Sequence, residues 1–485
     1  MSITIIGYLL LPLGLVAFFL GSRLFLLGLA TFFSAFSATA VINFTSSGLQ
    51  PSYYFGLLFI VRVTLDTMLT RKSFTRRQWQ LFGGFVLFAV IAFLSIIAIP
   101  FDAKALVVRP SGKTEVLKLT KENITQYLYV GYVLVFTGAV ALSRLREKEI
   151  VRLSRIFIAS GVFVSLWGWL QVVSFYSAVP YPDFLFNNNV SFSQNFEQLI
   201  RLIGIKRMTS VCPEPSMLAK FLLIPTFMSL YAVYNKGFLV PYKYAVPLAA
   251  FFVVTMVGTT SSTALAAVVG GFGIFIFVIL YRKRVMTALG VREKPNIKGL
   301  MLFVLTFSIL AVIVLVVAFV KIGLTLADLG NLIDILLFNK LDSQSGDVRI
   351  SGGAGAIELL LSHPLLGVGW GSNRSFDFLS NIGATTGFIG LSIMIIAHLV
   401  LGYRMTILSK TLVRDGQLRL SHYPLMLLFI VVVKFFIKVL SDPSIAFLDY
   451  WILIGIMIAC VRGLTPPRGE MSPAPGVSQK MEEES

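Results

Sequence analysis

Residues 71–101 read RKSFTRRQWQLFGGFVLFAVIAFLSIIAIPF, in which four basic residues precede a long run without any charged side chain. About 20 predominantly apolar residues are enough for a helix to cross the hydrocarbon core of a bilayer. A flanking cluster of lysine and arginine is typical of the cytoplasmic side of such a helix. This stretch therefore predicts one transmembrane helix whose N-terminal end lies in the cytoplasm.

The same pattern recurs along the chain, so we predict an all-α, polytopic integral membrane protein with about 12–13 transmembrane helices. The apolar segments are continuous and do not alternate with a period of two, which excludes a β-barrel. We expect one transmembrane catalytic domain over residues 1–462 and a disordered cytoplasmic tail over residues 463–485, which are rich in Pro, Gly and Ser. The predicted spans are residues 3–20, 24–44, 53–69, 80–101, 126–143, 156–178, 217–234, 241–259, 263–280, 300–320, 381–402, 422–440 and 445–462.

Composition excludes several other classes of protein. Of the 485 residues, 56% are hydrophobic and 13% are charged, whereas roughly 25% are charged in a typical soluble domain. The 41 lysines and arginines outnumber the 23 acidic residues, which gives a net charge of +18. Most of the basic residues fall in alternate loops, as the positive-inside rule predicts. The excess of basic residues therefore indicates which loops lie in the cytoplasm and contact anionic membrane lipids. We expect no nucleic-acid partner.

Three long loops fall on the opposite side, outside the cytoplasm. They are residues 102–125, 179–216 and 321–380, approximately. The first is predicted to form a β-hairpin. The second contains an amphipathic segment at 195–206, and the third contains helical stretches at about 327–341 and 353–362. Because binding and catalytic residues concentrate in loops held by a rigid scaffold, we expect the functional site on this side.

The longest loop contains GDVRISGGAGAIELLLSHPLLGVGWGSNRS, residues 346–375. Glycines let backbone N–H groups approach an anion closely, and a guanidinium is well suited to a phosphate or pyrophosphate. The alternative is that the glycines only form a tight turn. The candidate pyrophosphate-binding residues here are Arg349, Gly367, Gly369, Gly371 and Arg374.

A second candidate segment is KRMTSVCPEPSMLAK, residues 206–220. Glu214 lies between two prolines, which predicts a stiff, extended backbone at the start of a helix. Its carboxylate could act as a general base at the membrane face, or could only cap the helix. Arg207 precedes it by seven residues and is a further candidate for binding pyrophosphate.

Two polar features inside or between the spans also require an explanation. Ser261 and Ser262 lie in a hydroxyl-rich turn, which either caps two helices or hydrogen-bonds to a sugar or phosphate. Lys434 and Lys438 lie on one face of a predicted span, and buried charges of this kind are costly. They either bind an anionic lipid phosphate, or one lysine extends toward the membrane surface and the other pairs near Asp442.

Several other kinds of site are not predicted. The sequence contains no set of His, Cys, Asp or Glu residues at a metal-binding spacing and no P-loop, so we expect neither a metal nor ATP as a cofactor. The two cysteines, Cys212 and Cys460, are too far apart in the sequence to suggest a disulfide framework.

Residues of about 200–400 resemble the bacterial O-antigen ligase and polysaccharide polymerase superfamily, whose members are multi-span, GT-C-like glycosyltransferases with a large periplasmic loop. Three features carry the resemblance. They are the arm from Arg207 to Ser216, the turn Thr259–Thr263, and Arg349 followed by His363-Pro364 and Gly367-Val-Gly369. The family's ligases have a His-Asn pair about eleven residues before a Gly-x-x-Gly, for which Gly387–Gly390 provides the second part here. Phe376 and Asp377 occupy the place of that pair, which favours a repeat-unit (Wzy-type) polymerase over a (WaaL-type) ligase.

The resemblance implies transfer of a glycan from an undecaprenyl-pyrophosphate donor to a second lipid-linked repeat unit on the periplasmic face, without a metal. Arginines would stabilise the departing pyrophosphate. Glu214, His363 or Asp377 would accept the proton of the attacking sugar hydroxyl. The implied product is an O-antigen, exopolysaccharide or capsule chain, and the implied partners are the lipid-linked oligosaccharide, a chain-length regulator and a flippase.

A transporter or lipid-linked oligosaccharide flippase is the alternative from another class of protein. It would also need many spans and charges inside them. An inverted repeat with interrupted helices in corresponding halves would favour it, and the sequence contains no clear repeat of this kind.

Overall fold

The computed structural model describes most of residues 1–464. The exceptions within that range are residues 46, 72, 102–104, 109–113, 192–198, 201–204, 237, 292–295, 323–324, 326, 328–329 and 331–343. Apart from residues 327 and 330, the predicted helical stretch at 327–341 therefore lies outside the described residues, as does the tail from 465 to 485.

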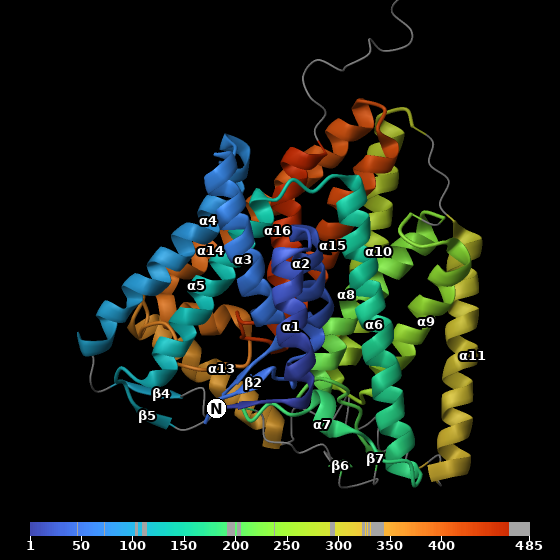
Figure 1. The fold of residues 1–485 in the computed structure, drawn as a ribbon, viewed down its shortest axis with the longest axis horizontal. Helices are drawn as coiled ribbons and strands as arrows, with labels where there is room; N and C mark the ends of the chain where they lie inside the picture. The colour runs from blue at the N-terminus through green and yellow to red at the C-terminus, as the bar shows by residue number, and fades with distance from the viewer. Residues whose placement is uncertain are drawn as a thin grey trace, which may run out of the picture.

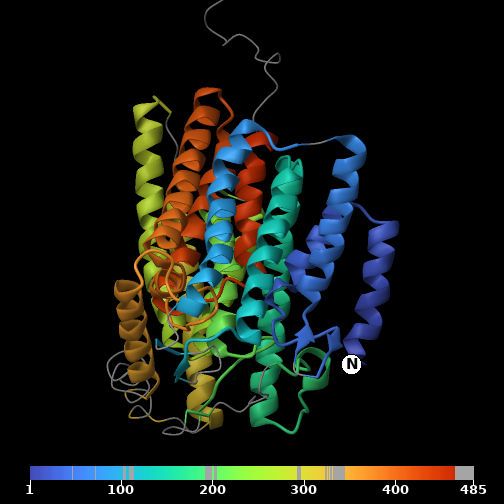
Figure 2. The same cartoon turned by 90° about the vertical axis from the view of Figure 1, so that its left-hand side faces the viewer.

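Long helices running in alternating directions form the body of the molecule (Figures 1 and 2). They are α1 (Ile5–Phe19), α2 (Arg23–Phe32), α3 (Pro51–Thr70), α4 (Arg76–Leu94), α5 (Lys121–Leu142), α6 (Glu147–Tyr176), α8 (Pro215–Tyr234), α9 (Tyr242–Gly258), α10 (Ser262–Ala288), α11 (Ile297–Ile322), α14 (Phe378–Arg414), α15 (Leu418–Ser441) and α16 (Leu448–Gly463). In the described part of the chain, eight helices are long and apolar enough to cross a membrane: α3, α4, α5, α6, α8, α10, α14 and α15. A helix overlaps each predicted span, so the prediction of a largely helical protein with several helices able to cross a membrane is confirmed, for eight helices of the 12–13 predicted.

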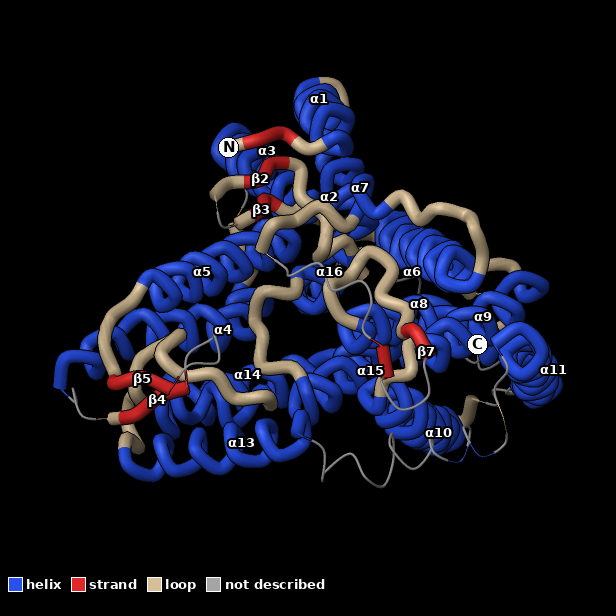
Figure 3. The backbone as a smooth tube through the Cα atoms, turned by 90° about the horizontal axis from the view of Figure 1, so that it is seen from below, coloured by secondary structure: helices blue, strands red, loops and turns tan. Residues whose placement is uncertain are grey.

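The two ends of the helical body differ. The end that we call the loop end carries the strands and short helices, namely β1 (Ser2–Ile3), β2 (Ile42–Asn43), β3 (Gly48–Leu49), β4 (Leu106–Val108), β5 (Thr114–Val116), α7 (Asp183–Phe186), β6 (Leu199–Ile200), β7 (Ile205–Lys206) and α13 (Gln344–Ser362) (Figures 1 and 3). The opposite end, which we call the basic end, carries the short connections that follow α3, α5, α10 and α14. The predicted hairpin is confirmed, because β4 and β5 pair antiparallel, with Val107 opposite Glu115.

Two sequence-based boundaries at the loop end were wrong. The span predicted for 24–44 ends earlier, since α2 stops at Phe32 and a 3-10 turn continues only to Ala35. The chain then leaves the helix because the Ala38 N–H donates to the Val211 carbonyl and its own carbonyl accepts from Asn189. The helix predicted at 353–362 is longer and begins at Gln344.

The amphipathic segment predicted at 195–206 is not a helix where it is described. Leu199 and Ile200 pair antiparallel with Lys206 and Ile205.

Helix α8 occupies the centre of the body, and most of its residues are buried against α6, α9, α10 and α15. Pro215 occupies its first turn, where the missing N–H costs no hydrogen bond, and Glu214 precedes it in an extended conformation as the sequence predicted. A close approach at Gly161, where a Cβ would lie 2.7 Å from the ring of Pro225, holds α6 against α8. This central helix carries Lys220 into the interior near the loop end.

The arrangement of the two ends predicts the outcome of cysteine labelling in cells. Both native cysteines are buried, so the wild-type protein should react little with a membrane-impermeant thiol reagent. In Thr114→Cys the new thiol lies in β5 at the loop end and should react in intact spheroplasts. In Asp415→Cys it lies after α14 at the basic end and should react only after the membrane is permeabilised. The reverse pattern would contradict the orientation predicted by the positive-inside rule.

Candidate functional site

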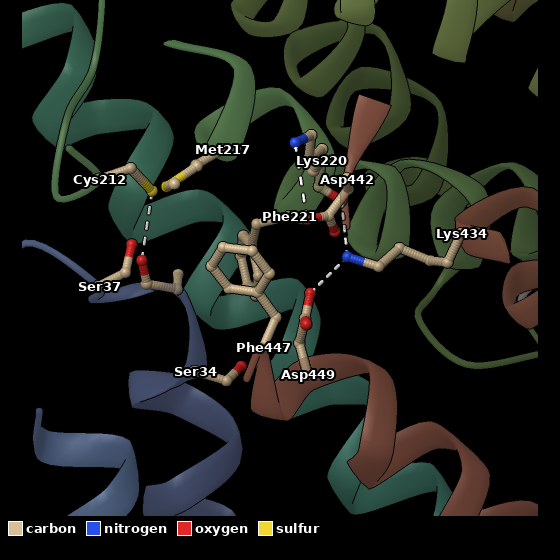
Figure 4. Close-up of a pocket in the computed structure, with 11 residues that line it drawn as sticks. Ser34, Ser37, Cys212, Met217, Lys220, Phe221, Lys434, Asp442, Phe447 and Asp449 are labelled. Atoms are coloured by element: carbon tan, nitrogen blue, oxygen red, sulfur yellow. Dashed lines mark hydrogen bonds and ion pairs between the residues drawn. The ribbon is translucent and has the colours of Figure 1, made fainter. Parts of the chain in front are cut away.

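Two buried ion pairs lie where α15, α16 and α8 meet near the loop end (Figure 4). The Lys434 ammonium is 2.5 Å from the Asp449 carboxylate, which comes from the start of α16. The Lys438 ammonium is 3.2 Å from Asp442, one turn further along the chain, and also donates to the Ser444 carbonyl. All four of these charged side chains are at most 8% exposed. Burial of this extent requires a charge partner, because an isolated ion in an apolar interior costs far more free energy than a paired one.

Lys220 of α8 adds a third lysine to these pairs. Its ammonium donates to the Ser441 carbonyl at 2.9 Å and is 3.9 Å from Asp442. The Lys434 ammonium in turn donates to the backbone carbonyl of Lys220 at 3.0 Å. We call these five residues the lysine–aspartate network; they are Lys220, Lys434, Lys438, Asp442 and Asp449. With three lysines and two aspartates in their usual ionisation states, the network has one positive charge in excess.

A small pocket adjoins the network. In Figure 4 the side chains of Lys220, Asp442, Lys434 and Asp449 lie close together beside Phe447. The pocket is lined by Ser34, Ala35, Ser37, Cys212, Met217, Lys220, Phe221, Lys434, Asp442, Phe447 and Asp449. Part of the charge of the network is therefore accessible from a cavity and is not sealed inside the helix bundle.

The predicted arm and hydroxyl-rich turn meet beside this network. Arg207 donates from Nε to the Thr259 carbonyl at 3.5 Å, and Thr263 on the other side of the turn lies 3.4 Å from the Ser441 hydroxyl. Burial lowers the pKa of Arg207, and the nearby Glu214 carboxylate opposes this shift. The arm, the turn and the end of α15 are thus brought together from separate parts of the sequence.

Glu214 and Arg349 complete the cluster of charges. Lys220 is close enough to both for electrostatic interaction, as it is to Asp442 and Lys434. Arg349 and Arg374 both lie over the ring of Phe376, with guanidinium carbons 5.9 and 5.7 Å from its centroid. The lysine–aspartate network together with Arg207, Arg349 and Glu214 contains five cations and three carboxylates, so two positive charges are in excess.

The three candidate proton acceptors occupy different environments. Glu214 is exposed beside the cluster and accepts from the Ser216 hydroxyl at 3.2 Å. Asp377 instead caps α14, where its carboxylate accepts from the Ser380 N–H at 2.8 Å and from the Ser375 hydroxyl at 2.9 Å. His363 follows the last residue of α13, while Arg349 lies near the start of that helix; fourteen residues of helix separate them by about 21 Å. The distance disfavours His363. Asp377 lies next to Phe376 and so is near Arg349, but its carboxylate is engaged in the helix cap, whereas Glu214 is the exposed carboxylate of the three.

The glycine-rich stretch is a packed turn and differs from the expected anion-binding loop. Gly367, Gly369 and Gly371 all have positive φ, at 65°, 92° and 76°, as a tight turn requires. A Cβ at Gly367 would lie 2.4 Å from the Ala384 carbonyl oxygen, and one at Gly369 would lie 2.5 Å from Ile99.

The backbone donors of this stretch also point into the protein. The N–H groups of Gly367 and Val368 donate to the carbonyls of His363 and Ala384, and that of Trp370 donates to the Ser95 hydroxyl. These three N–H groups already have acceptors, which favours the alternative of a structural turn.

Ser261 and Ser262 lie at the start of α10, as a capping role predicts, but the Ser261 side chain makes no capping hydrogen bond. The neighbouring Thr260 has a positive φ of 45°, and its buried hydroxyl has no hydrogen-bond partner among the described residues. An unpaired buried hydroxyl costs free energy. Both interpretations of the turn, as a cap and as a ligand contact, therefore remain.

The sequence did not predict the partners of the buried lysines. One of the two alternatives for these lysines was a pairing near Asp442. Lys434 pairs instead with Asp449 on the next helix, and Lys438 pairs with Asp442. The sequence does place Asp442 and Asp449 on either side of the connection between two predicted apolar spans. That position indicated them as possible partners for the lysines.

Comparison with protein-family models finds no match to this chain, and comparison with characterised proteins finds none either. In the described residues, no group of three or more His, Cys, Asp or Glu side chains is placed to hold a metal ion. The functional interpretation therefore rests on the geometry of the charged cluster and on the sequence motifs.

Removal of one partner from a buried pair should destabilise the protein. We expect Asp449→Asn to lower the free energy of unfolding by about 3–5 kcal/mol, because it leaves the Lys434 ammonium buried without its carboxylate. The double variant Lys434→Met/Asp449→Leu should recover most of that loss. Thermal unfolding of the purified proteins in detergent measures both. A single variant as stable as the wild type would show that the pair is not ionised in the folded protein.

Proposed function

We propose that this protein is a glycosyltransferase of the polysaccharide-polymerase type that acts at the periplasmic face of a bacterial inner membrane and has a GT-C-like architecture. Its donor would be a glycan linked to undecaprenyl pyrophosphate, and its acceptor a second lipid-linked repeat unit. The observation that carries the proposal is the cluster of Arg207, Lys220 and Arg349 beside the lysine–aspartate network, with two positive charges in excess. An excess of this size matches the charge of a pyrophosphate diester.

The location of the cluster also supports a lipid-linked substrate. It lies at the loop-end termini of α8 and α15, helices that are apolar and long enough to cross a membrane. A lipid carrier keeps its pyrophosphate at the membrane surface, so its charge would meet the cluster while its prenyl chain remains among the helices. The predicted orientation puts this end on the periplasmic side.

The reaction consists of one bond exchange. The hydroxyl oxygen of the acceptor sugar attacks the anomeric carbon of the donor, the bond from that carbon to the pyrophosphate oxygen breaks, and undecaprenyl pyrophosphate leaves with the electron pair. Arg207, Arg349 and Lys220 stabilise the charge that develops on the leaving group. Glu214 accepts the proton of the attacking hydroxyl.

Two other functions would use parts of the same cluster. An O-antigen ligase would transfer the glycan to lipid A-core or another acceptor, and a flippase would move the lipid-linked oligosaccharide without chemistry. The exposed carboxylate of Glu214 beside the cationic cluster favours a transferase over a flippase, because transport alone needs no proton acceptor. In reconstituted vesicles, polymer ladders, transfer to lipid A, or a change of sidedness alone would distinguish the three.

Loss of either arginine should abolish chain extension. We expect Arg207→Gln and Arg349→Gln each to lower polymerisation of purified lipid-linked repeat unit by about 10²–10³-fold, because each removes a cation that stabilises the leaving group. Cells that carry either variant should accumulate single lipid-linked repeat units.

Lys118→Gln is the matched control, since it removes an exposed cation from the hairpin at the same end of the molecule. It should leave polymer length unchanged. Normal polymer length in both arginine variants would refute the proposal.

The choice of proton acceptor is tested with isosteric amides. Glu214→Gln should lower kcat by about 10²–10⁴-fold with KM nearly unchanged, since the amide keeps the shape but accepts no proton. Asp377→Asn should mainly lower stability, by about 0.5–2 kcal/mol, because it weakens a helix cap. If Asp377→Asn or His363→Gln removes the activity of a folded protein while Glu214→Gln does not, the assignment to Glu214 is wrong.

A further inference from the structure

A second charged hollow lies at the basic end, far from the cluster just described. It is open to solvent and is lined by Leu24, Glu147, Lys148, Glu149, Val151, Arg152, Arg155, Ile156, Ala159 and Arg419. A neighbouring hollow shares Leu24 and Glu149 and adds Arg23 and Arg144. Cations and apolar side chains therefore line the same concave surface, between the starts of α2, α6 and α15.

Three of the cations lie on one face of α6. Lys148, Arg152 and Arg155 are spaced four and three residues apart, so they follow one another on successive turns, and all three are exposed. Arg155 donates from Nε to the Leu239 carbonyl at 2.7 Å, which fixes its side chain without neutralising it. Within the described chain, no carboxylate lies at ion-pair distance from any of the three.

The two acidic residues of the hollow have partners other than these three cations. The Glu147 carboxylate lies 2.9 Å from Arg419 and accepts from the Tyr423 hydroxyl at 2.9 Å. Glu149 accepts from the backbone N–H of Arg146 at 2.8 Å, as a capping residue. The charges of Lys148, Arg152 and Arg155 are thus directed to the open hollow.

The length of α6 sets the depth of this hollow in a bilayer. Thirty residues of helix are about 45 Å long, whereas the hydrocarbon core is about 30 Å thick. The surplus lets the first turns of α6, with Lys148 and Arg152, lie among the lipid head groups. Ile156 and Ala159 lie deeper along the helix than all three cations, where acyl chains begin, which is the vertical order of charge and apolar surface in a phospholipid.

We propose that this hollow binds the phosphate group of an anionic phospholipid from the cytoplasmic leaflet, with Lys148, Arg152 and Arg155 around the phosphate and the apolar side chains against its acyl chains. Basic pockets between helices on the cytoplasmic side are suited to such head groups. The site is independent of the transferase reaction proposed above.

The test uses the full-length protein in mild detergent, titrated with phosphatidylglycerol or with phosphatidylcholine of the same acyl chains, and read by native mass spectrometry and thermal unfolding. We expect retained phosphatidylglycerol adducts and a raised Tm for the wild type. Lys148→Gln/Arg152→Gln should bind about 10- to 30-fold more weakly, whereas Lys148→Arg/Arg152→Lys should bind as the wild type does. The Tm of each variant without lipid reports whether it folds.

Lys283→Gln/Arg284→Gln is the matched control, because it removes the same charge from exposed positions of α10 on the same end. It should leave binding unchanged. Equal weakening in this control would mean a general surface attraction and would overturn the proposal. Equal affinity for the two lipids would overturn it as well, as would an equal rise of Tm with inorganic phosphate, which would indicate a site for the free ion.

Discussion

The cost of burying charge inside a membrane protein constrains this structure more than any other interaction. Lys434 and Lys438 can lie in the interior of α15 only because Asp449 and Asp442 accompany them. The Asp449 carboxylate fixes α16 against α15, whereas Asp442 lies at the C-terminal end of α15 itself. The bond from Lys434 to the Lys220 carbonyl fixes α8 against α15. The lysine–aspartate network therefore sets the packing of the central helices and, through Lys220, the position of the charge that reaches the pocket.

The same network explains how the proposed site can be assembled from distant segments. The arm that contains Arg207, the turn after α9 and the end of α15 are joined by short contacts to Thr259 and Ser441. Each of these segments is short and polar, and each is anchored by a helix whose packing is fixed by apolar burial. A cluster held in this way is preorganised, so its cations need no rearrangement when charge develops on a leaving group.

Apolar periodicity was sufficient to predict the helices, because about 20 uncharged residues have few alternatives in a bilayer. It failed where tertiary hydrogen bonds compete, as at Ala38, whose bonds to Val211 and Asn189 end the span after α2. The arginine and glutamate candidates came from motifs and lie close together, whereas the glycines of the 367–371 turn are explained by packing. Asp449 was missed because pairing across two helices depends on how they face each other, and local sequence spacing does not contain that information.

The most direct test of the account is a cryo-EM structure of the protein with a polyprenyl pyrophosphate bound. The account predicts that density for the two phosphorus atoms lies between Arg207, Lys220 and Arg349, beside the pocket of the lysine–aspartate network. Density at the glycine turn near Gly369, or at the basic end beside Arg152, would contradict the central claim that this cluster binds the leaving group.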